Sequence, residues 1–345
     1  MPRGKANYDV CVIGAGLVGL AVAWAIARER PGASILIVDK ENGVAQHQSG
    51  HNSGVVHSGL YYKPGSLKAQ LCVEGRETMY QLCERAGIAH ERSGKLVIAT
   101  KARELEALRE LERRGRSNGL SGIERVDRDG IREYEPHAAG LEAIHVPDSG
   151  VADFPAVAGH LARLLVDDHH TDVLYGTQVT GLRHLTDGVE VETSQGSHTT
   201  RLLVNCAGLH SDRVAVMAGL EPRVRIVPFR GEYYRMTDEA SQLVRGLIYP
   251  VPDPRYPFLG VHFTRRIDDM VEVGPNAILA IGREHYRGAS PDWGELGSLM
   301  RYGGFWRLAR KNWISGVREM VYSRSKRLYT RLARRLLPAL DHADI

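Results

Sequence analysis

Three glycines near the N-terminus and an acidic residue further along are the first residues whose types and spacing could do chemistry. Gly14, Gly16 and Gly19 have the spacing G-x-G-x-x-G, and Asp39 ends the next apolar run. The glycines allow a tight turn, a close approach of the backbone to a pyrophosphate, and close packing of a helix on a strand. The helix N-terminus would face the phosphates and the carboxylate would bind a ribose hydroxyl. The pattern therefore predicts a dinucleotide site.

The elements that must position these residues are a strand, a helix and a second strand. Residues 8–13 form an apolar run that stops at Gly14, as a buried parallel strand would. Residues 17–26 are apolar on almost every face and precede Pro31, where a helix would end. Residues 33–38 form a second buried strand. In this order the three elements form a βαβ unit, so the glycine pattern lies in a Rossmann-like nucleotide-binding unit.

Length and composition narrow the class of protein. The chain has 345 residues, 43% hydrophobic and 25% charged, which favours two domains of ordinary size. A formal net charge of +4 is too small to indicate nucleic-acid binding. No apolar run could span a membrane, and the first residues lack a signal peptide's apolar stretch. The cysteines lack metal-ligand spacing and are expected to be reduced, in a cytoplasmic protein: Cys11, Cys72, Cys83 and Cys206.

Periodicity and turn residues predict the remaining elements. Helices are predicted at residues 67–86, at 102–116, from Asp153 to about residue 168, near Ser211 and after Gly297. Strands are predicted at residues 95–100, 172–179, 188–193, 201–206, 230–236 and 258–265. The second half of the chain is therefore expected to be rich in strands.

A Ser/Gly/His-rich stretch follows the second strand, where a nicotinamide enzyme would continue with further strand–helix repeats. The segment HNSGVVHSGLYY at residues 51–62 resembles the L-2-hydroxyglutarate oxidase/dehydrogenase family of the D-amino-acid-oxidase-like flavoproteins. The same resemblance is carried by FRGEYY from Phe229, IYPVPDP from Ile248, PFLGVHFTR from Pro257 and VGPNA from Val273. It implies FAD as cofactor and oxidation of L-2-hydroxyglutarate to 2-oxoglutarate. Oxidation of an amine or of glycerol 3-phosphate, or an inactive fragment, are the alternatives.

The resemblance also implies an α/β (α+β) architecture in which the FAD-binding domain is interleaved with a mixed-sheet substrate domain. Residues 1–90 and 148–222 are predicted to form the FAD-binding domain, and residues 91–147 and 223–330 the substrate domain. Residues 331–345 are predicted to be a polar tail. Members of the family continue into a segment that completes the flavin site, and nothing after Pro338 resembles it. The chain is therefore expected to be either a truncated or frame-shifted product or a shortened protein with weakened FAD binding.

Further cofactor-binding residues are assigned by the resemblance. Asn205-Cys-Ala-Gly208 is similar to the second FAD motif of these flavoproteins, in which a strand ends in small residues beside the ADP moiety. Val179, at the end of an earlier strand, matches the position that contacts adenine. Besides the glycine pattern and Asp39, the predicted FAD-binding residues are Lys40, Ser49, Ser53, Gly54, Val179, Ala207 and Gly208.

Oxidation of an alcohol beside a carboxylate needs a base for the hydroxyl proton, and histidine suits that role at neutral pH. His57 follows the Ser53-Gly54 turn in the segment expected to pass the flavin. His262 lies in a strand whose alternation puts Phe263 on one face and His262 with Thr264 on the other. That polar pair could equally be solvated. Either histidine could be the base.

A dicarboxylate substrate needs groups that hold its carboxylates. Arg230 begins a strand in which it shares a face with Glu232, and a guanidinium can bind a carboxylate with two hydrogen bonds. An exposed ion pair with Glu232 is the alternative role of Arg230. Tyr249, before the proline-rich loop, is a second candidate, and Tyr61 and Tyr62 are weaker ones.

Two other patterns remain. His47, His51 and His57 are a possible metal-binding pattern, but the spacing of His47 and His51 converges on a metal only in a helix, which Ser49-Gly50 disfavours. With no carboxylate or cysteine beside these histidines, no metal site is expected. The basic residues between Arg301 and Arg335, interleaved with Trp306 and Trp313, could lie on an anionic membrane surface. The electron acceptor is then expected to be either oxygen or a membrane quinone.

Overall fold

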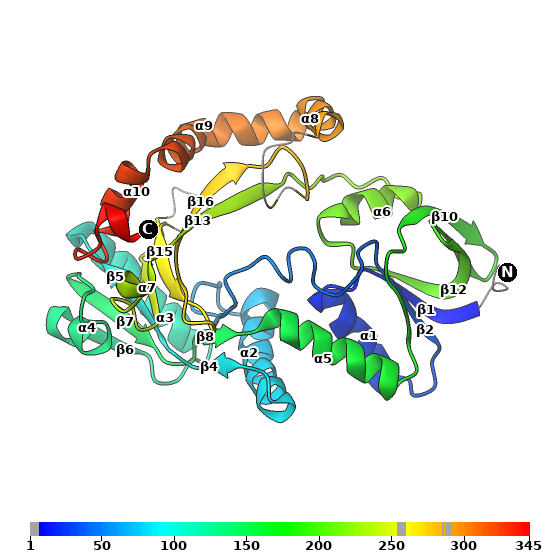
Figure 1. The fold of residues 1–345 in the computed structure, drawn as a ribbon, viewed down its shortest axis with the longest axis horizontal. Coiled ribbons are helices and arrows are strands. Elements are labelled where there is room, and N and C mark those ends of the chain that lie inside the picture. Colours follow the sequence, from blue (N-terminus) through cyan, green and yellow to red (C-terminus); the bar gives the residue numbers. More distant parts are fainter. Residues whose placement is uncertain (1–6, 254–259, 285, 287–291) are drawn as a thin grey trace. The chain divides into compact units, whose positions relative to one another are not determined.

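The computed structural model describes residues 7–253, 260–284, 286 and 292–345, and in it the chain forms two compact units. Each unit is assembled from three separate stretches of chain, which Figure 1 shows by colour. The first unit comprises Met1–Asn52, Phe154–Pro228 and Ile281–Gly304. The second comprises Ser53–Asp153, Phe229–Ala280 and Phe305–Ile345.

The first unit is built on a six-stranded sheet with the order β10-β11-β12-β1-β2-β9. The strands β12, β1, β2 and β9 run parallel, and β10 and β11 extend the sheet as antiparallel strands. Their bounds are β1 Asn7–Ile13, β2 Ile35–Val38, β9 Asp172–Leu174, β10 Val179–Leu185, β11 Gly188–Thr193 and β12 Gly196–Asn205. The parallel half carries the predicted βαβ unit, since β1 and β2 are joined by α1.

Helices of the first unit pack beside this sheet. The helix α1 is apolar on several faces because it packs against both the sheet and α5. On one face of the sheet the core includes Cys11, Leu36, Val38 and Val191. The bounds are α1 Leu17–Glu29, α5 Phe154–Asp167, α6 Ser211–Met217 and α8 Trp293–Met300, with a short 3₁₀ helix at Gly208–His210.

The second unit contains a seven-stranded mixed sheet with the order β13-β16-β15-β14-β5-β7-β6. Only β14 and β5 are paired in parallel; the other pairs are antiparallel. A separate three-stranded sheet has the order β3-β8-β4. The bounds are β3 Val55–Val56, β4 His90–Glu91, β5 Lys95–Ala99, β6 Glu124–Asp127, β7 Glu142–Val146, β8 Gly150–Ala152, β13 Phe229–Arg235, β14 Leu247–Pro250, β15 His262–Arg265 and β16 Val271–Leu279.

Both faces of the seven-stranded sheet are covered. Along β5, Leu96 and Ile98 belong to one core cluster, whereas Val97 and Ala99 belong to the other. Period-two alternation therefore places apolar residues on both faces, and β5 is fully buried. The helices are α2 Leu67–Ala86, α3 Leu105–Ser117, α4 Arg128–Tyr134, α7 Asp238–Ser241, α9 Gly303–Arg324, whose first two residues belong to the first unit, and α10 Lys326–Ala333, with 3₁₀ turns at Ala102–Glu104 and His342–Asp344.

Several element predictions are confirmed and two strands are corrected. The helix at residues 67–86 and the strand at 188–193 have the predicted bounds. The single strand predicted at 172–179 is instead two, β9 and β10, because the chain turns at Gly176, where φ is 60°. Val179 therefore begins a strand rather than ending one. Of the strand predicted at 258–265, Phe258 and Leu259 lie outside the described residues, and β15 begins at His262.

The last fifteen residues differ from the predicted polar tail. Leu336, Leu337 and Leu340 are buried in the same core cluster as Leu96 and Phe263. The carbonyl of Leu336 also accepts a hydrogen bond from the backbone N–H of Ala139 at 2.9 Å. The leucines recur at helix-like spacing, and this apolar face, rather than the polar residues between them, determines the position of the segment.

The compact units divide the chain at other residues than the predicted domains do. Residues 53–90 pack with the second unit, since β3 pairs with β8 and β4 pairs with β8. Residues 281–304 pack with the first unit. The assignment of cofactor and substrate roles to domains stays a prediction.

Candidate functional sites in the two units

The glycine turn of the first unit has the geometry that its sequence predicts. Gly14 has a φ of 109°, and a Cβ atom there would overlap the carbonyl oxygen of Cys206. A Cβ on Gly19 would overlap the carbonyl oxygen of Gly14. Gly16 caps the N-terminus of α1 and offers no side chain of its own. The turn is therefore a cradle of backbone groups at a helix N-terminus, as pyrophosphate binding requires.

Two predicted side chains lie beside this turn. The carboxylate of Asp39 accepts hydrogen bonds from the backbone N–H of Ala15 at 2.6 Å and of Glu41 at 2.9 Å. The hydroxyl of Ser49 accepts a hydrogen bond from the N–H of Leu17 at 2.9 Å. The structure thus brings Asp39 and Ser49 to the start of α1, where the cofactor's phosphates and ribose are expected.

The second predicted FAD motif lies against the same turn. The backbone N–H of Cys206 donates to the carbonyl of Ile13 at 2.9 Å, so β12 ends directly beside β1. Ala207 follows, and Gly208 has a φ of 54° where the chain turns into a 3₁₀ helix. Val179 is half-buried and packs on the apolar core of the first unit, one strand removed from these residues in the sheet order.

Lys40 lies in an ion-pair network within the first unit. Its ammonium donates to Glu41 and contacts Glu284 at 2.9 Å and His47 Nε2 at 3.0 Å. The Nε2 atom of His210 also contacts Glu284, at 2.7 Å. One reason for expecting no metal from the sequence is that no carboxylate lies beside the histidines. That reason is wrong, because Glu41 and Glu284 lie beside His47, and the three side chains could together hold a metal ion. The ammonium of Lys40 already supplies a positive charge to both carboxylates there.

Ser53 and Gly54 begin the second unit. Gly54 has a φ of 72°, and its carbonyl accepts a hydrogen bond from the N–H of Ala152 at 2.9 Å. The structure thus explains the glycine as a turn that leads into β3. Their role in FAD binding stays a prediction.

The second unit gathers polar side chains on one face of its seven-stranded sheet. Cross-strand pairing of Leu247 with both Lys95 and Thr264 places these residues on the same face. Alternation along β14 and β15 adds Tyr249 and His262 to that face. The predicted split between Phe263 on one side and His262 with Thr264 on the other is therefore correct. The suggestion that the polar pair is solvated is wrong, because His262 is 5% exposed and Thr264 is fully buried.

Lys95 lies at the centre of this cluster and is 2% exposed. Its Nζ atom is 3.3 Å from Nδ1 of His57 and 4.3 Å from the centre of the Tyr249 ring. The Tyr61 ring centre is 5.5 Å away. Within the described part of the chain, Lys95 forms no ion pair with a carboxylate. A buried ammonium without a counter-ion is unusual and indicates a functional site.

The Tyr249 ring stacks on the His262 ring, with their centres 4.0 Å apart and an angle of 19° between the planes. The Tyr249 hydroxyl is 3.5 Å from that of Thr264. The Nδ1 atom of His262 is 2.9 Å from the carbonyl oxygen of Gly260. Two of the predicted catalytic residues are thus in direct contact, and His57 joins them through Lys95.

Burial governs the protonation of the cluster. Burial lowers the pKa of Lys95 to about 7. Burial, together with the Lys95 ammonium, lowers the pKa of His262 to about 4. His57 keeps solvent-exposed surface, but the protein atoms crowded around its ring and then the Lys95 cation lower its pKa below the usual 6.5. Both imidazoles are therefore neutral at pH 7, as a general base must be.

Arg230, Tyr61 and Tyr62, the remaining candidates for substrate binding, do not belong to the Tyr249–His262 stack. Arg230 is on β13, two strands from β15, and its guanidinium contacts the Glu232 carboxylate at 2.7 Å. The alternative of an ion pair is thus observed, and a substrate role for Arg230 stays a prediction. The Tyr61 hydroxyl is buried without a hydrogen-bond partner among the described residues, and burial raises its pKa. Tyr62 is only partly buried.

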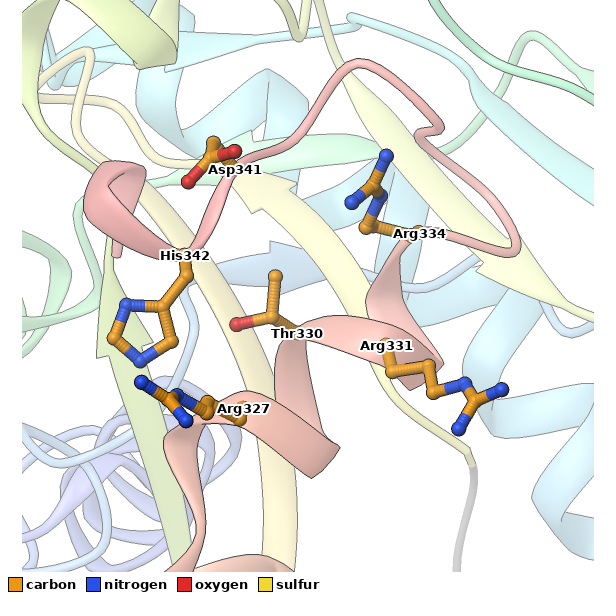
Figure 2. Close-up of a pocket in the computed structure, with 6 residues that line it drawn as sticks. All are labelled: Arg327, Thr330, Arg331, Arg334, Asp341 and His342. Carbon is orange, nitrogen blue, oxygen red and sulfur yellow. The ribbon is translucent and has the colours of Figure 1, made fainter.

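A surface pocket of about 660 Å³ lies on α10 and the segment after it, away from this cluster in sequence. Figure 2 shows that the guanidinium groups of Arg327, Arg331 and Arg334 point in different directions. They do not converge on one ligand position, and none of the predicted site residues lines the pocket. It adds positive charge to the surface near α9.

Sequence reasoning missed Lys95. A lysine that opens the run KLVIA resembles an ordinary polar strand end, and no local pattern announces its burial. Only the pairing of β5 with β14, whose residues are more than a hundred positions away, brings Tyr249 over its ammonium. The sequence pointed to this site only through His57 and Tyr61, which contact Lys95 in space and belong to the segment that carries the family resemblance.

Comparisons with known proteins identify the family of the chain. Residues 9–338 match the family model "FAD dependent oxidoreductase". The chain is 43% identical to an L-2-hydroxyglutarate dehydrogenase of Indibacter alkaliphilus, covering 98% of this chain and 85% of that protein. It is 38% identical to the mitochondrial L-2-hydroxyglutarate dehydrogenase of Homo sapiens, covering 99% and 76%.

The fold has a close match among solved structures. An FAD-bound L-alpha-glycerophosphate oxidase from Mycoplasma pneumoniae has a TM-score of 0.79 at 20% identity, covering 99% of this chain and 81% of that one. A glycine oxidase from Geobacillus kaustophilus has a TM-score of 0.69 at 20% identity, covering 86% and 77%. The backbone cradle at Gly14, Gly19 and Ala207 fits the cofactor of this family. The chain therefore belongs to the FAD-dependent oxidoreductases, in the branch that contains the L-2-hydroxyglutarate dehydrogenases.

Proposed function

We propose that this protein oxidises L-2-hydroxyglutarate to 2-oxoglutarate. The observation that carries the proposal is the cluster of His57 with the buried Lys95, Tyr249 and His262, together with relatives whose names state this activity. The cluster supplies a neutral imidazole as base and a cation for an anionic substrate. Bound FAD would accept the hydride from the carbon that carries the hydroxyl.

We assign the base to His262 on the basis of its hydrogen bonding. A carbonyl oxygen can only accept, so the contact with Gly260 requires that Nδ1 carries the proton. The Nε2 lone pair is then left to take the hydroxyl proton. A carboxylate of the substrate would raise the pKa of the resulting imidazolium, because opposite charges favour the charged form.

His57 has the opposite tautomer while Lys95 is protonated. An ammonium can only donate, so Nδ1 of His57 accepts from Nζ of Lys95 and Nε2 carries the ring proton. His57 is therefore a hydrogen-bond donor suited to hold a substrate oxygen, and His262 the acceptor. The sequence left open which histidine is the base, and we assign different roles to the two.

The first experiment is an absorbance spectrum of the purified, FAD-reconstituted protein before and after anaerobic addition of L-2-hydroxyglutarate. We expect bleaching of the flavin band and formation of 2-oxoglutarate, with no bleaching by the D-enantiomer. Bleaching by glycerol 3-phosphate or an amine alone would favour the alternative substrates. A preparation that retains no flavin would contradict an enzymatic role.

The base is tested by rapid-mixing measurement of flavin reduction at saturating substrate. His262→Gln should slow reduction by about 10²- to 10⁴-fold, the usual contribution of a general base. His57→Gln should mainly weaken substrate binding. If His57→Gln has the larger effect on the saturated rate, the two roles are reversed, and if neither variant slows it, neither histidine is the base.

We also propose that α9 contacts an anionic membrane, which would place the enzyme near the membrane quinones. Trp306, Trp313 and Val317 follow one another at helical spacing and are 52%, 63% and 47% exposed. Exposed Arg307 and Lys311 lie beside this stripe. Apolar residues next to basic ones are typical of helices that lie in the membrane interface. None of the helices in the described ranges could span a membrane.

Flotation with lipid vesicles tests this contact. We expect binding to vesicles that contain phosphatidylserine, weaker binding at high salt, and a reduction by Trp313→Glu. Trp293→Glu, at a tryptophan 73% exposed on α8, is the matched control and should bind like the parent. The proposal would be refuted if Trp313→Glu bound anionic vesicles as well as Trp293→Glu does, or if the protein bound neutral and anionic vesicles equally.

A further inference from the structure

A buried positive charge in the second unit lacks a carboxylate partner among the described residues. Lys95 is almost fully enclosed, and its contacts are an imidazole nitrogen and the faces of two aromatic rings. A buried ammonium is stabilised by a carboxylate in most proteins, because the cost of removing it from water is large. No carboxylate contacts Lys95 in the part of the chain that the structure describes.

A second polar group in the same cluster is also unsatisfied. The Tyr61 hydroxyl is buried, and no hydrogen-bond partner for it lies among the described residues. Its ring centre is 5.5 Å from the Lys95 ammonium. Burial raises the pKa of Tyr61, so the hydroxyl stays protonated and can donate. A cation without a carboxylate partner and a hydroxyl donor without an acceptor form a site complementary to an anion.

We propose that Lys95 and Tyr61 bind one carboxylate of the substrate, which makes them determinants of specificity for acidic substrates. This inference rests on the proposed function for the identity of the acid, but the site itself rests on the contacts above. The carboxylate would accept from Nζ of Lys95 and from the Tyr61 hydroxyl. The bound carboxylate would also keep Lys95 protonated. The Lys95 ammonium would then keep donating to Nδ1 of His57, which fixes the tautomer of that histidine.

Proton uptake is a consequence that a purely structural lysine would not show. In the free protein Lys95 loses its proton near neutral pH. The titratable groups around it are His57, Tyr61, Cys72, Tyr249 and His262, and none of them is an acid that is ionised at pH 8. A bound carboxylate would raise the pKa of Lys95, so binding at pH 8 should take up about one proton.

The test is calorimetric titration of the FAD-reconstituted protein with glutarate, a dicarboxylate that has no hydroxyl and cannot react. We expect binding at pH 6.5 that weakens by about tenfold for each pH unit above 7. Titration in two buffers of different ionisation enthalpy should give the uptake of about one proton at pH 8. Lys95→Met should weaken binding by about 10- to 100-fold and abolish this uptake.

Control variants keep the test interpretable. Lys68→Met, at an exposed lysine on α2, should bind glutarate like the parent. Tyr61→Phe removes only the hydroxyl and should weaken binding by about 3- to 10-fold without changing proton uptake. If Lys95→Met fails to fold, Tyr61→Phe and the proton count of the parent still decide the matter.

The outcomes separate this inference from the proposed function. Unchanged glutarate affinity and proton uptake in Lys95→Met would overturn the inference, as would a parent protein that does not bind glutarate. If the parent binds glutarate through Lys95 but is not reduced by L-2-hydroxyglutarate, only the proposed function fails.

Discussion

Replacing Lys95 by methionine should stabilise the protein without ligand, and by an amount that depends on pH. Methionine has a similar length and no charge, so it fills the same space among apolar neighbours. Removal of a buried, unpaired charge removes its desolvation cost. The variant is therefore expected to unfold at a higher urea concentration than the parent at pH 7.

The magnitude follows from the pKa of Lys95. Its ordinary value is 10.5 and burial lowers it to about 7 in the folded protein. Each unit of pKa difference corresponds to about 1.4 kcal/mol, so the folding penalty is about 5 kcal/mol well below pH 7, about 4 at pH 7 and about 2 at pH 9. Between pH 7 and pH 10.5 Lys95 is more often protonated in the unfolded chain than in the folded protein. The penalty is therefore complete well below pH 7 and disappears as the pH rises towards 10.5.

The assay is urea unfolding of parent and variant at pH 7 and pH 9. The difference in free energy of unfolding between Lys95→Met and the parent should shrink by about 2 kcal/mol between the two pH values. Contributions of other groups cancel in this difference. Lys68→Met should show no such change. A difference for Lys95→Met that stays constant within about 0.5 kcal/mol would show that Lys95 is not a buried base of lowered pKa.

Three further predictions concern the cofactor cradle and the core. Gly19→Ala places a Cβ against the carbonyl oxygen of Gly14, so the purified protein should retain much less flavin, measured by the ratio of flavin to protein absorbance; unchanged retention would argue against the cradle. Asp39→Asn should weaken FAD binding about tenfold in a fluorescence titration, because it removes the charge that Ala15 N–H contacts, and an unchanged affinity would contradict a ribose-binding role. Leu337→Ala should lower the free energy of unfolding by about 2–4 kcal/mol, and a loss below about 1 kcal/mol would mean that this leucine is not part of the core.

Local signals explain what the sequence predicts well. The helix at residues 67–86 has the predicted bounds because its ends are marked locally. The Ser66 hydroxyl caps the N-terminus by accepting from the N–H of Ala69, and Gly87 adopts a φ of 64° at the C-terminus. The glycine turn and Asp39 are predictable for the same reason, since strand, helix and strand follow in one stretch of chain.

Features that depend on contacts between distant residues could not be predicted from the sequence. The strand β16 contains Gly274-Pro275, which favours a turn, yet the sheet continues through a bulge opposite Tyr233. Lys95 begins an apolar strand like many surface lysines, and its burial depends on residues brought together by sheet pairing. The histidines could be named from the sequence, but their different tautomers depend on Gly260 and Lys95.

The core of the second unit has a consequence for synthesis of the chain on the ribosome. Its apolar residues come from Leu96, from the strands around Phe263 and from Leu340, so contacts join the first third of the chain to its last residues. Domains fold during translation as soon as their residues have emerged. This core cannot close before residue 340 has been made, and the apolar residues that β5 and β7 contribute to it stay incompletely covered until then. We expect the nascent chain to depend on chaperones until Leu340 has emerged.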